Sequence, residues 1–217
     1  MNRNSNPWLR RGIGAGLAIV LIVAMALNTK FLTPDEVSAL GPETFDPAKE
    51  AQTLFTKAQN DLTFVPAGDV VPDLHTDVKA AAEEHGGIPT SDSAYTFPVA
   101  VEGTVSEATD ASVQVTVSGV PKETKIIIPL TTAVNGTVLR DAMGFKFADA
   151  PGQTEYQYVG DEIKKLIQQQ VTESVDDPAA LKGKKITVQG LLAVQATGKA
   201  VPKPKPLNVQ IVTIEAG

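Results

Sequence analysis

An uncharged stretch near the N-terminus most constrains what this chain can fold into. Residues Gly12–Leu27 carry no charge, and the residues before them include Arg3, Arg10 and Arg11 but no acid. A backbone in hydrocarbon must satisfy its hydrogen bonds internally, so we expect this run to form a helix in a lipid bilayer. Because the arginines precede the helix, residues 1–11 are predicted to stay in the cytoplasm and the main domain to lie outside it.

Three interpretations of this segment are open. The uncharged run approaches the ~20 residues of a bilayer span if the side chain of Lys30 reaches the interface, which predicts a single-pass anchor at 12–32. The small residues of Ala24-Met25-Ala26 also fit a signal peptidase site, with cleavage after Ala26. A twin-arginine signal at Arg10-Arg11 is the third interpretation, but the residues that follow do not fit it. We favour the uncleaved anchor in the cell membrane.

Charge and composition exclude several classes of function. The whole chain has a net charge of −6, but residues 1–30 carry four basic residues and no acid, so residues 31–217 carry −10. An acidic domain repels phosphate backbones, which argues against nucleic acid as a partner. There is no cysteine, hence no disulfide and no thiolate ligand. His75 and His85 are ten residues apart and do not form the i, i+4 pair of a zinc helix, so we expect no metal and no cofactor.

Residues 33–90 carry helical signals and are predicted to form a small helical layer. Phe45-Asp46-Pro47 combines an N-cap with a first-turn proline, and apolar residues follow it at helical spacing. A further helix is expected to begin at Pro72 or Leu74 and to end at His85, where two glycines stop it.

Residues 91–217 have the pattern of a β-rich domain. Three expected strands, a helix and two more strands follow one another, which is the order of an OB-like five-stranded antiparallel β-barrel with its helix between strands 3 and 4. The fold class is therefore α+β, and another small antiparallel sheet packed by the same helix is the alternative. The expected strands are Tyr95–Val105, Ser112–Ser118, Lys125–Leu130, Lys184–Val194 and Leu207–Ile214, with the helix over Val159–Val171.

One segment resembles a known family. The run Gly136-Thr-Val-Leu-Arg-Asp-Ala-Met-Gly-Phe-Lys-Phe147, followed by Gln153-Thr-Glu-Tyr156, resembles the signature of an uncharacterised family of predicted periplasmic lipoproteins. That family is a domain of unknown function often encoded beside sugar ABC transporters. The resemblance implies an extracytoplasmic role near a sugar importer and supplies no reaction. This chain lacks the lipid-attachment cysteine, so the membrane helix is expected to be the tether instead.

The same segment holds the candidate binding residues. An arginine fork can grip a carboxylate or a pair of hydroxyls, and an aspartate beside it can accept hydrogen bonds from hydroxyls. A structural salt bridge is the alternative for this pair, and core packing is the alternative for the aromatic residues. The candidates are Asn135, Thr137, Arg140, Asp141, Phe145, Phe147, Gln153 and Tyr156.

These observations predict a non-enzymatic accessory or binding module, and the family resemblance implies that it works with an ABC-type sugar importer. Its expected partners are the transporter permease or solute-binding protein, a small sugar, and the membrane. A structural tether or assembly factor is the first alternative. The second is a carbohydrate-processing hydrolase that draws paired carboxylates from Asp141, Asp149, Glu155 and Asp161. The basic connection Lys199–Pro206 is expected to be a stiff solvated loop or a docking place for an acidic partner.

Overall fold

The structure is a computed structural model that describes residues 16, 20–21, 23–25 and 45–216. The chain divides into two compact units, Met1–Thr44 and Phe45–Gly217. In the first unit the described residues are helical and exposed. Most of the predicted anchor at 12–32, its cytoplasmic tail and the cleavage point at Ala26 lie outside the described residues. Among the residues that are described, no helix has the length and apolar character needed to cross a membrane.

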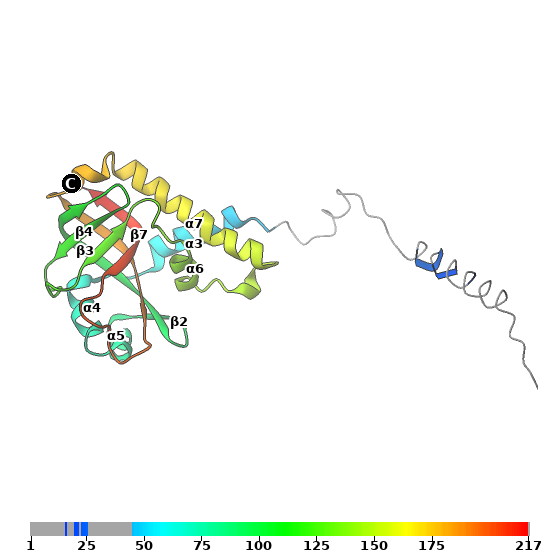
Figure 1. Cartoon of the computed structure of the whole chain (residues 1–217), viewed down its shortest axis with the longest axis horizontal. Helices are drawn as coiled ribbons and strands as arrows, with labels where there is room; N and C mark the ends of the chain where they lie inside the picture. The colour runs from blue at the N-terminus through cyan, green and yellow to red at the C-terminus, as the bar shows by residue number, and fades with distance from the viewer. Residues whose placement is uncertain (1–15, 17–19, 22, 26–44, 217) are drawn as a thin grey trace, which may run out of the picture. The chain divides into compact units, whose positions relative to one another are not determined.

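The second unit combines one curved sheet with helices packed around it (Figure 1). Its helices are α3 (Pro47–Asp61), α4 (Ala67–Leu74), α5 (Val78–His85), α6 (Thr137–Ala142) and α7 (Gln153–Ser174), with short 3-10 helices η1 (Phe147–Asp149) and η2 (Pro178–Leu181). Its strands are β1 (Val65–Pro66), β2 (Ile88–Ser91), β3 (Ala94–Ala108), β4 (Ser112–Val117), β5 (Ile126–Pro129), β6 (Lys185–Gln195) and β7 (Leu207–Ala216).

The sheet has seven strands: six follow the order β1-β3-β4-β5-β7-β6, and β2 pairs with β3 beside this path. Strand β6 also pairs with β3. The long β3–β6 pairing is antiparallel, whereas β5 and β7 run parallel and pair only at Ile126↔Leu207 and Ile127↔Asn208. The predicted order of three strands, a helix and two strands is confirmed. The predicted OB-like five-stranded antiparallel β-barrel is confirmed only in part: β1 and β2 join the sheet, two pairings are parallel, and the sheet is not a closed barrel.

Helices α3 and α7 pack against each other and both contact β7 (Figure 1). The buried side chains of α3 are Ala51, Leu54, Phe55 and Ala58, and those of α7 include Val159, Ile163, Ile167 and Val171. Their spacing of three and four residues is the helical period on which both predictions were based. Helix α7 begins at Gln153, about a turn and a half before the predicted start, and these added turns carry part of the candidate site.

The region between residues 67 and 85 differs from the prediction. A single helix ending at His85 was expected, but the structure has two helices, α4 and α5. They separate because the side chain of Asp77 accepts hydrogen bonds from the backbone N–H of Lys79 (3.0 Å) and Ala80 (3.2 Å), which starts a new helix. The predicted glycine stop is confirmed, since Gly86 ends α5 in the left-handed conformation with φ 69°.

Candidate functional site

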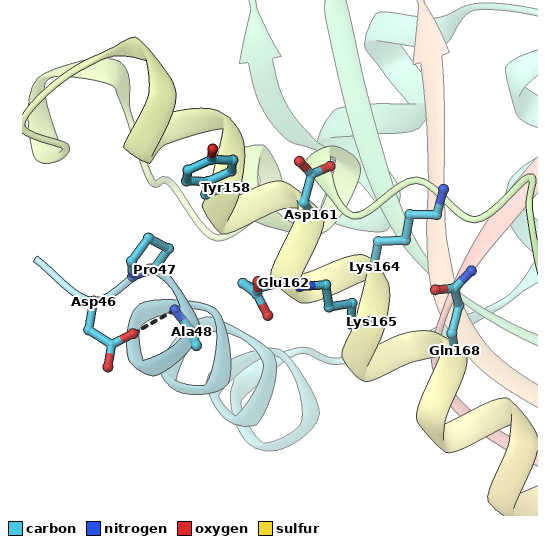
Figure 2. Close-up of a pocket in the computed structure, with 9 residues that line it drawn as sticks. All are labelled: Asp46, Pro47, Ala48, Tyr158, Asp161, Glu162, Lys164, Lys165 and Gln168. Atoms are coloured by element: carbon cyan, nitrogen blue, oxygen red, sulfur yellow. Dashed lines mark hydrogen bonds and ion pairs between the residues drawn. The ribbon is translucent and has the colours of Figure 1, made fainter.

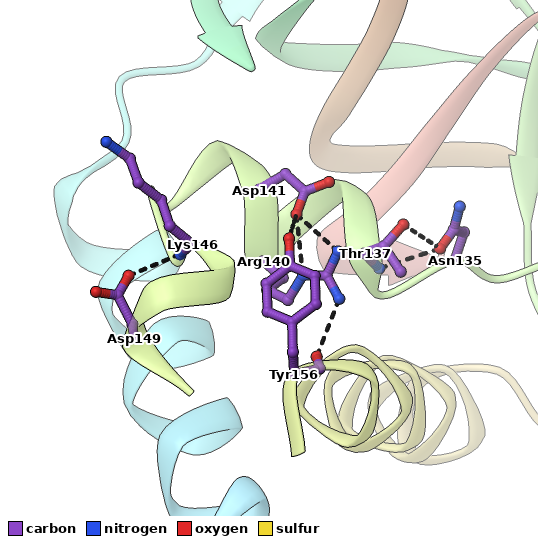
Figure 3. A network of polar contacts seen from close by, with 7 residues as sticks. All are labelled: Asn135, Thr137, Arg140, Asp141, Lys146, Asp149 and Tyr156. Carbon is purple, nitrogen blue, oxygen red and sulfur yellow. Dashed lines mark hydrogen bonds and ion pairs between the residues drawn. The ribbon is translucent and has the colours of Figure 1, made fainter. Parts of the chain in front are cut away.

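Helix α6 lies against the first turns of α7 at a contact between two glycines. A Cβ atom on Gly136 would collide with the carbonyl oxygen of Gly160, so the close approach of the two helices requires glycine at position 136. This approach brings the charged residues at the end of α6 to the aromatic residues at the start of α7 (Figure 3). The site is therefore built on two packed helices.

Arg140 is the centre of the resulting network. Its side chain is only 7% exposed, and its Nε and Nη2 atoms lie 2.9 and 2.8 Å from Oδ1 of Asp141. Its Nη1 donates a hydrogen bond of 3.0 Å to the carbonyl oxygen of Tyr156, and the guanidinium carbon lies 3.7 Å from the centre of the Tyr156 ring. Arg140 and Asp141 therefore form the salt bridge that was the alternative interpretation of this pair. The guanidinium group already makes its hydrogen bonds within the protein.

Tyr156 joins the same network from α7. Its hydroxyl donates to Oδ1 of Asp141 at 3.2 Å. Burial raises the pKa of Tyr156, and the negative charge of Asp141 raises it further. The Tyr156 ring stacks on Phe145 with ring centres 6.0 Å apart and meets Phe147 edge-on at 5.7 Å. Predicted residues from α6, α7 and the segment between them thus form one contiguous cluster.

The outer side of this cluster is partly open to solvent. Asp141 is 38% exposed, and within the described part of the chain its second carboxylate oxygen, Oδ2, accepts no hydrogen bond. Phe147 is 58% exposed. These two groups are the part of the predicted site that a ligand can reach.

The other predicted residues lie apart from this cluster. Asn135 caps the start of α6, because its Oδ1 accepts from the backbone N–H of Thr137 (3.0 Å) and from the Thr137 hydroxyl (2.8 Å). Gln153 is the exposed first residue of α7. The structure therefore places Asn135 in the turn that leads into α6, as the Asn-Gly dipeptide also indicates, and Thr137 at the first position of that helix.

A cleft of about 630 Å³ opens beside this network, between the N-terminus of α3 and the outer face of α7 (Figure 2). Tyr158 stands on its wall and is 53% exposed; in the described part of the second unit, Phe147 and Tyr158 are the exposed large hydrophobic residues. The lining residues are Asp46, Pro47, Ala48, Tyr158, Asp161, Glu162, Lys164, Lys165 and Gln168.

Most polar groups in the cleft are already paired. The Nζ atom of Lys165 lies 2.6 Å from Glu162, and this hydrogen bond and charge raise the pKa of Lys165. Lys164 and Gln168 donate to backbone carbonyl oxygens of the segment that precedes α6. Asp161 makes no hydrogen bond or ion pair with any described residue, although its negative charge contributes to the raised pKa of Lys165. The cleft thus offers one unpaired carboxylate beside an exposed aromatic ring.

Of the cleft residues, only Asp161 is a sequence-predicted candidate, as a carboxylate of the hydrolase alternative. Tyr158, Asp161, Glu162 and Lys165 recur at three- and four-residue spacing on one face of α7, a signal that was present. What the sequence did not indicate was that Asp46, at the start of α3, lies opposite them. That depends on how α3 packs on α7.

The carboxylates of the hydrolase alternative have different surroundings. Asp141 is bound to Arg140, Asp149 accepts a hydrogen bond from the backbone N–H of Lys146 (2.7 Å), and Asp161 lines the cleft. Glu155 lies in the first turn of α7. No described contact unites two of them.

Comparison with known proteins adds two findings. The sequence profile of a family described as "Predicted periplasmic lipoprotein (DUF2291)" matches residues 17–204. Among solved structures, an OB-fold protein from Thermotoga maritima is similar with a TM-score of 0.64 and 16% identity, covering 81% of this chain and 100% of that one. At this identity the likeness concerns the fold alone, and it supports an OB fold. No curated protein matches the chain.

Proposed function

The chain belongs to the family of predicted periplasmic lipoproteins, and from this premise we propose that it is a non-enzymatic extracytoplasmic module that binds a small sugar. In this proposal the segment at 12–32 anchors the protein in the cell membrane. The partner is the permease or the solute-binding protein of an ABC-type sugar importer. The importer part of the proposal comes from the family resemblance of the sequence.

The observation that carries the binding proposal is the exposed ring of Tyr158 on the wall of the 630 Å³ cleft. Small-molecule sites commonly have volumes of ~300–1,000 Å³ and combine aromatic walls with a few polar groups. Aromatic faces pack against the apolar faces of sugar rings, and carboxylates accept hydrogen bonds from hydroxyls. Tyr158 supplies the face and Asp161 supplies the unpaired carboxylate.

The predicted residues have a supporting role in this proposal. Arg140 holds the carbonyl oxygen of Tyr156, two residues before Tyr158 on the same helix. The stacked rings of Phe145 and Tyr156 fix the side of α7 that faces away from the cleft. The network therefore positions the first turns of α7, and Tyr158 with them.

A thermal-shift experiment on the full-length protein in detergent tests the proposal with a panel of pentoses and hexoses. A ligand at 100 times its Kd stabilises the folded state by about 2.7 kcal/mol, which gives a measurable rise in Tm. We expect at least one sugar to raise Tm, and we expect Tyr158→Ala to abolish that rise. Asp161→Asn should reduce it.

Phe147→Ala is the matched control, because it removes an aromatic residue of similar exposure that lies outside the cleft. Retention of the sugar effect in Phe147→Ala and its loss in Tyr158→Ala would support the cleft. The reverse result would move binding to the outer side of the Arg140–Asp141 network. If no sugar raises Tm and a permease still co-purifies with the protein, the assembly role replaces the binding role.

A further inference from the structure

Helices α4 and α5 bring three potential metal ligands together at a place remote in sequence from the cleft. Asp73 comes from α4, and Glu84 and His85 come from the end of α5. Each offers one ligand atom, and these atoms all lie within 4.8 Å of one another. The Nε2 atom of His85 already lies 2.8 Å from Oδ2 of Asp73.

The backbone holds two of these ligands in place. The carbonyl oxygen of Asp73 accepts hydrogen bonds from the backbone N–H of Thr76 and of Asp77, both at 2.9 Å, and Asp77 then caps α5. Both helices pack on β3. The imidazole of His85 is only 11% exposed, whereas the carboxylate of Asp73 is 46% exposed. The pair is therefore preorganised, with one side open to solvent.

The charges at this place are not balanced. Two carboxylates face one imidazole, and no described lysine or arginine pairs with Asp73. Glu84 makes no hydrogen bond or ion pair with any described residue, although it lies beside the Asp73–His85 contact. A bound cation would be neutralised by both carboxylates and would accept the nitrogen lone pair of a neutral His85.

We propose that Asp73, Glu84 and His85 bind a divalent transition-metal ion of the Zn²⁺ type, with water in the remaining position. Imidazole nitrogen and carboxylate oxygen are both donors that Zn²⁺ accepts, and three protein ligands with one water complete a four-coordinate site. The proposal is independent of sugar binding, because none of the three residues lines the cleft at α7.

The present geometry requires only small side-chain movements to accept the ion. Bond lengths of about 2.0–2.2 Å place the donors of a tetrahedral zinc site roughly 3.3–3.5 Å apart. The 2.8 Å contact between His85 and Asp73 would open slightly, and the exposed side chain of Glu84 would move inward. The metal would take the place of the hydrogen bond and join α4 to α5.

The sequence expectation of no metal was based on the spacing of histidines and the lack of cysteine. Carboxylates that approach one histidine across a turn lie outside that pattern. Here the break at Asp77 folds α5 back beside α4, which brings Asp73 to His85.

Isothermal titration of the full-length protein with Zn²⁺, after removal of metals with a chelator, tests the proposal. We expect one ion per chain and a rise in Tm on Zn²⁺ addition. Glu84→Gln is the main variant, because this exposed side chain has no described contact to lose in the metal-free protein. It should weaken Zn²⁺ binding at least tenfold, whereas Glu83→Gln, the adjacent exposed acid on the same helix, should leave it unchanged.

His85→Gln provides a second test, since glutamine can keep a hydrogen bond to Asp73 while it removes the imidazole donor. Circular dichroism of this variant should show that the fold is retained, and its Zn²⁺ affinity should fall by more than that of Glu84→Gln. The proposal is overturned if the unmodified protein binds no Zn²⁺, or if Glu84→Gln and Glu83→Gln bind it equally well. Sugar-induced shifts in Tm should be the same in Glu84→Gln as in the unmodified protein.

Discussion

The guanidinium group of Arg140 both stacks on the ring of Tyr156, at 3.7 Å from its centre, and donates to the carbonyl oxygen of the same residue. Asp141 accepts hydrogen bonds from both side chains. Three residues from two helices therefore form a unit in which each member contacts the other two. The segment with the strongest family resemblance thus first of all holds α6 against α7. Its binding role depends on the residues that this contact positions.

Replacement of Arg140 by lysine should destabilise the protein. Lysine keeps the positive charge but lacks the planar group that stacks on Tyr156 and the several donors that reach Asp141 and the Tyr156 carbonyl. We expect the free energy of unfolding to fall by about 1–3 kcal/mol, as for a disrupted, largely buried polar network. Urea denaturation of both proteins measures this.

The control for Arg140→Lys is Lys57→Ala on α3, where an exposed lysine has no hydrogen bond or ion pair with a described residue. Its effect should stay within about 0.5 kcal/mol, as is usual at the surface. Equal stability of Arg140→Lys and the unmodified protein would show that the network contributes nothing that a simple charge cannot replace.

The raised pKa of Tyr156 predicts a pH dependence. Burial and then the charge of Asp141 hold this pKa above the ordinary value of 10.0. The unfolded chain therefore loses the proton first as the pH rises, and the stability linked to the neutral hydroxyl is present below pH 10 and lost above it. We expect urea midpoints between pH 8 and 11 to fall more steeply for the unmodified protein than for Tyr156→Phe. Parallel curves would contradict the assignment.

The parts of the fold that were predicted correctly have local signals. Helix α3 follows from an aspartate N-cap, a proline and apolar residues at helical spacing, and the strands of the OB order follow from alternation. Strands β1 and β2 were missed because they are short and exist only through pairing with β3. The break between α4 and α5 did have a local signal, since Asp77 precedes an apolar residue as N-caps do.

The candidate site was likewise predictable only where its contacts join residues that are close in sequence or share one motif. Arg140 and Asp141 are neighbours in sequence, so their ion pair was predictable, and Tyr156 belongs to the same family signature. The sequence could not predict that Asp46 and Tyr158 line the same cleft, because this depends on the packing of α3 against α7. Contacts between residues far apart in sequence require the fold first.

The close contact between α6 and α7 predicts that Gly136→Ala is strongly destabilising. The added Cβ would collide with the carbonyl oxygen of Gly160, and backbone atoms cannot move aside as a flexible side chain can. We expect a loss of about 1–3 kcal/mol in urea denaturation, in the range of other forced overpacking. Gly198→Ala is the control, since nothing lies within 4 Å of a Cβ there. A Gly136→Ala protein as stable as Gly198→Ala would refute the tight helix contact.

The basic connection Lys199–Pro206 is fixed to the helices at Val201, which predicts its resistance to protease. Val201 is 4% exposed, its N–H donates to the carbonyl oxygen of Leu74 (2.8 Å), and its own carbonyl oxygen accepts from Nδ1 of His75 (2.9 Å). The carbonyl oxygen of Lys199 accepts from the backbone N–H of Val78 (2.9 Å), which holds the peptide bond after Lys199 in place.

Val201→Asp should release this connection, because an unpaired carboxylate cannot remain in the apolar site that valine fills. Trypsin should then cut after Lys199 at least tenfold faster than in the unmodified protein, whereas the bonds that join Lys203 and Lys205 to proline resist trypsin in both proteins. Mass spectrometry of timed digests identifies the cut, and Pro202→Ala, at an exposed neighbour, should leave its rate unchanged. If Val201→Asp is cut no faster after Lys199, Val201 does not hold the connection Lys199–Pro206 in place. The lysines of this loop then do not lie on an anchored segment.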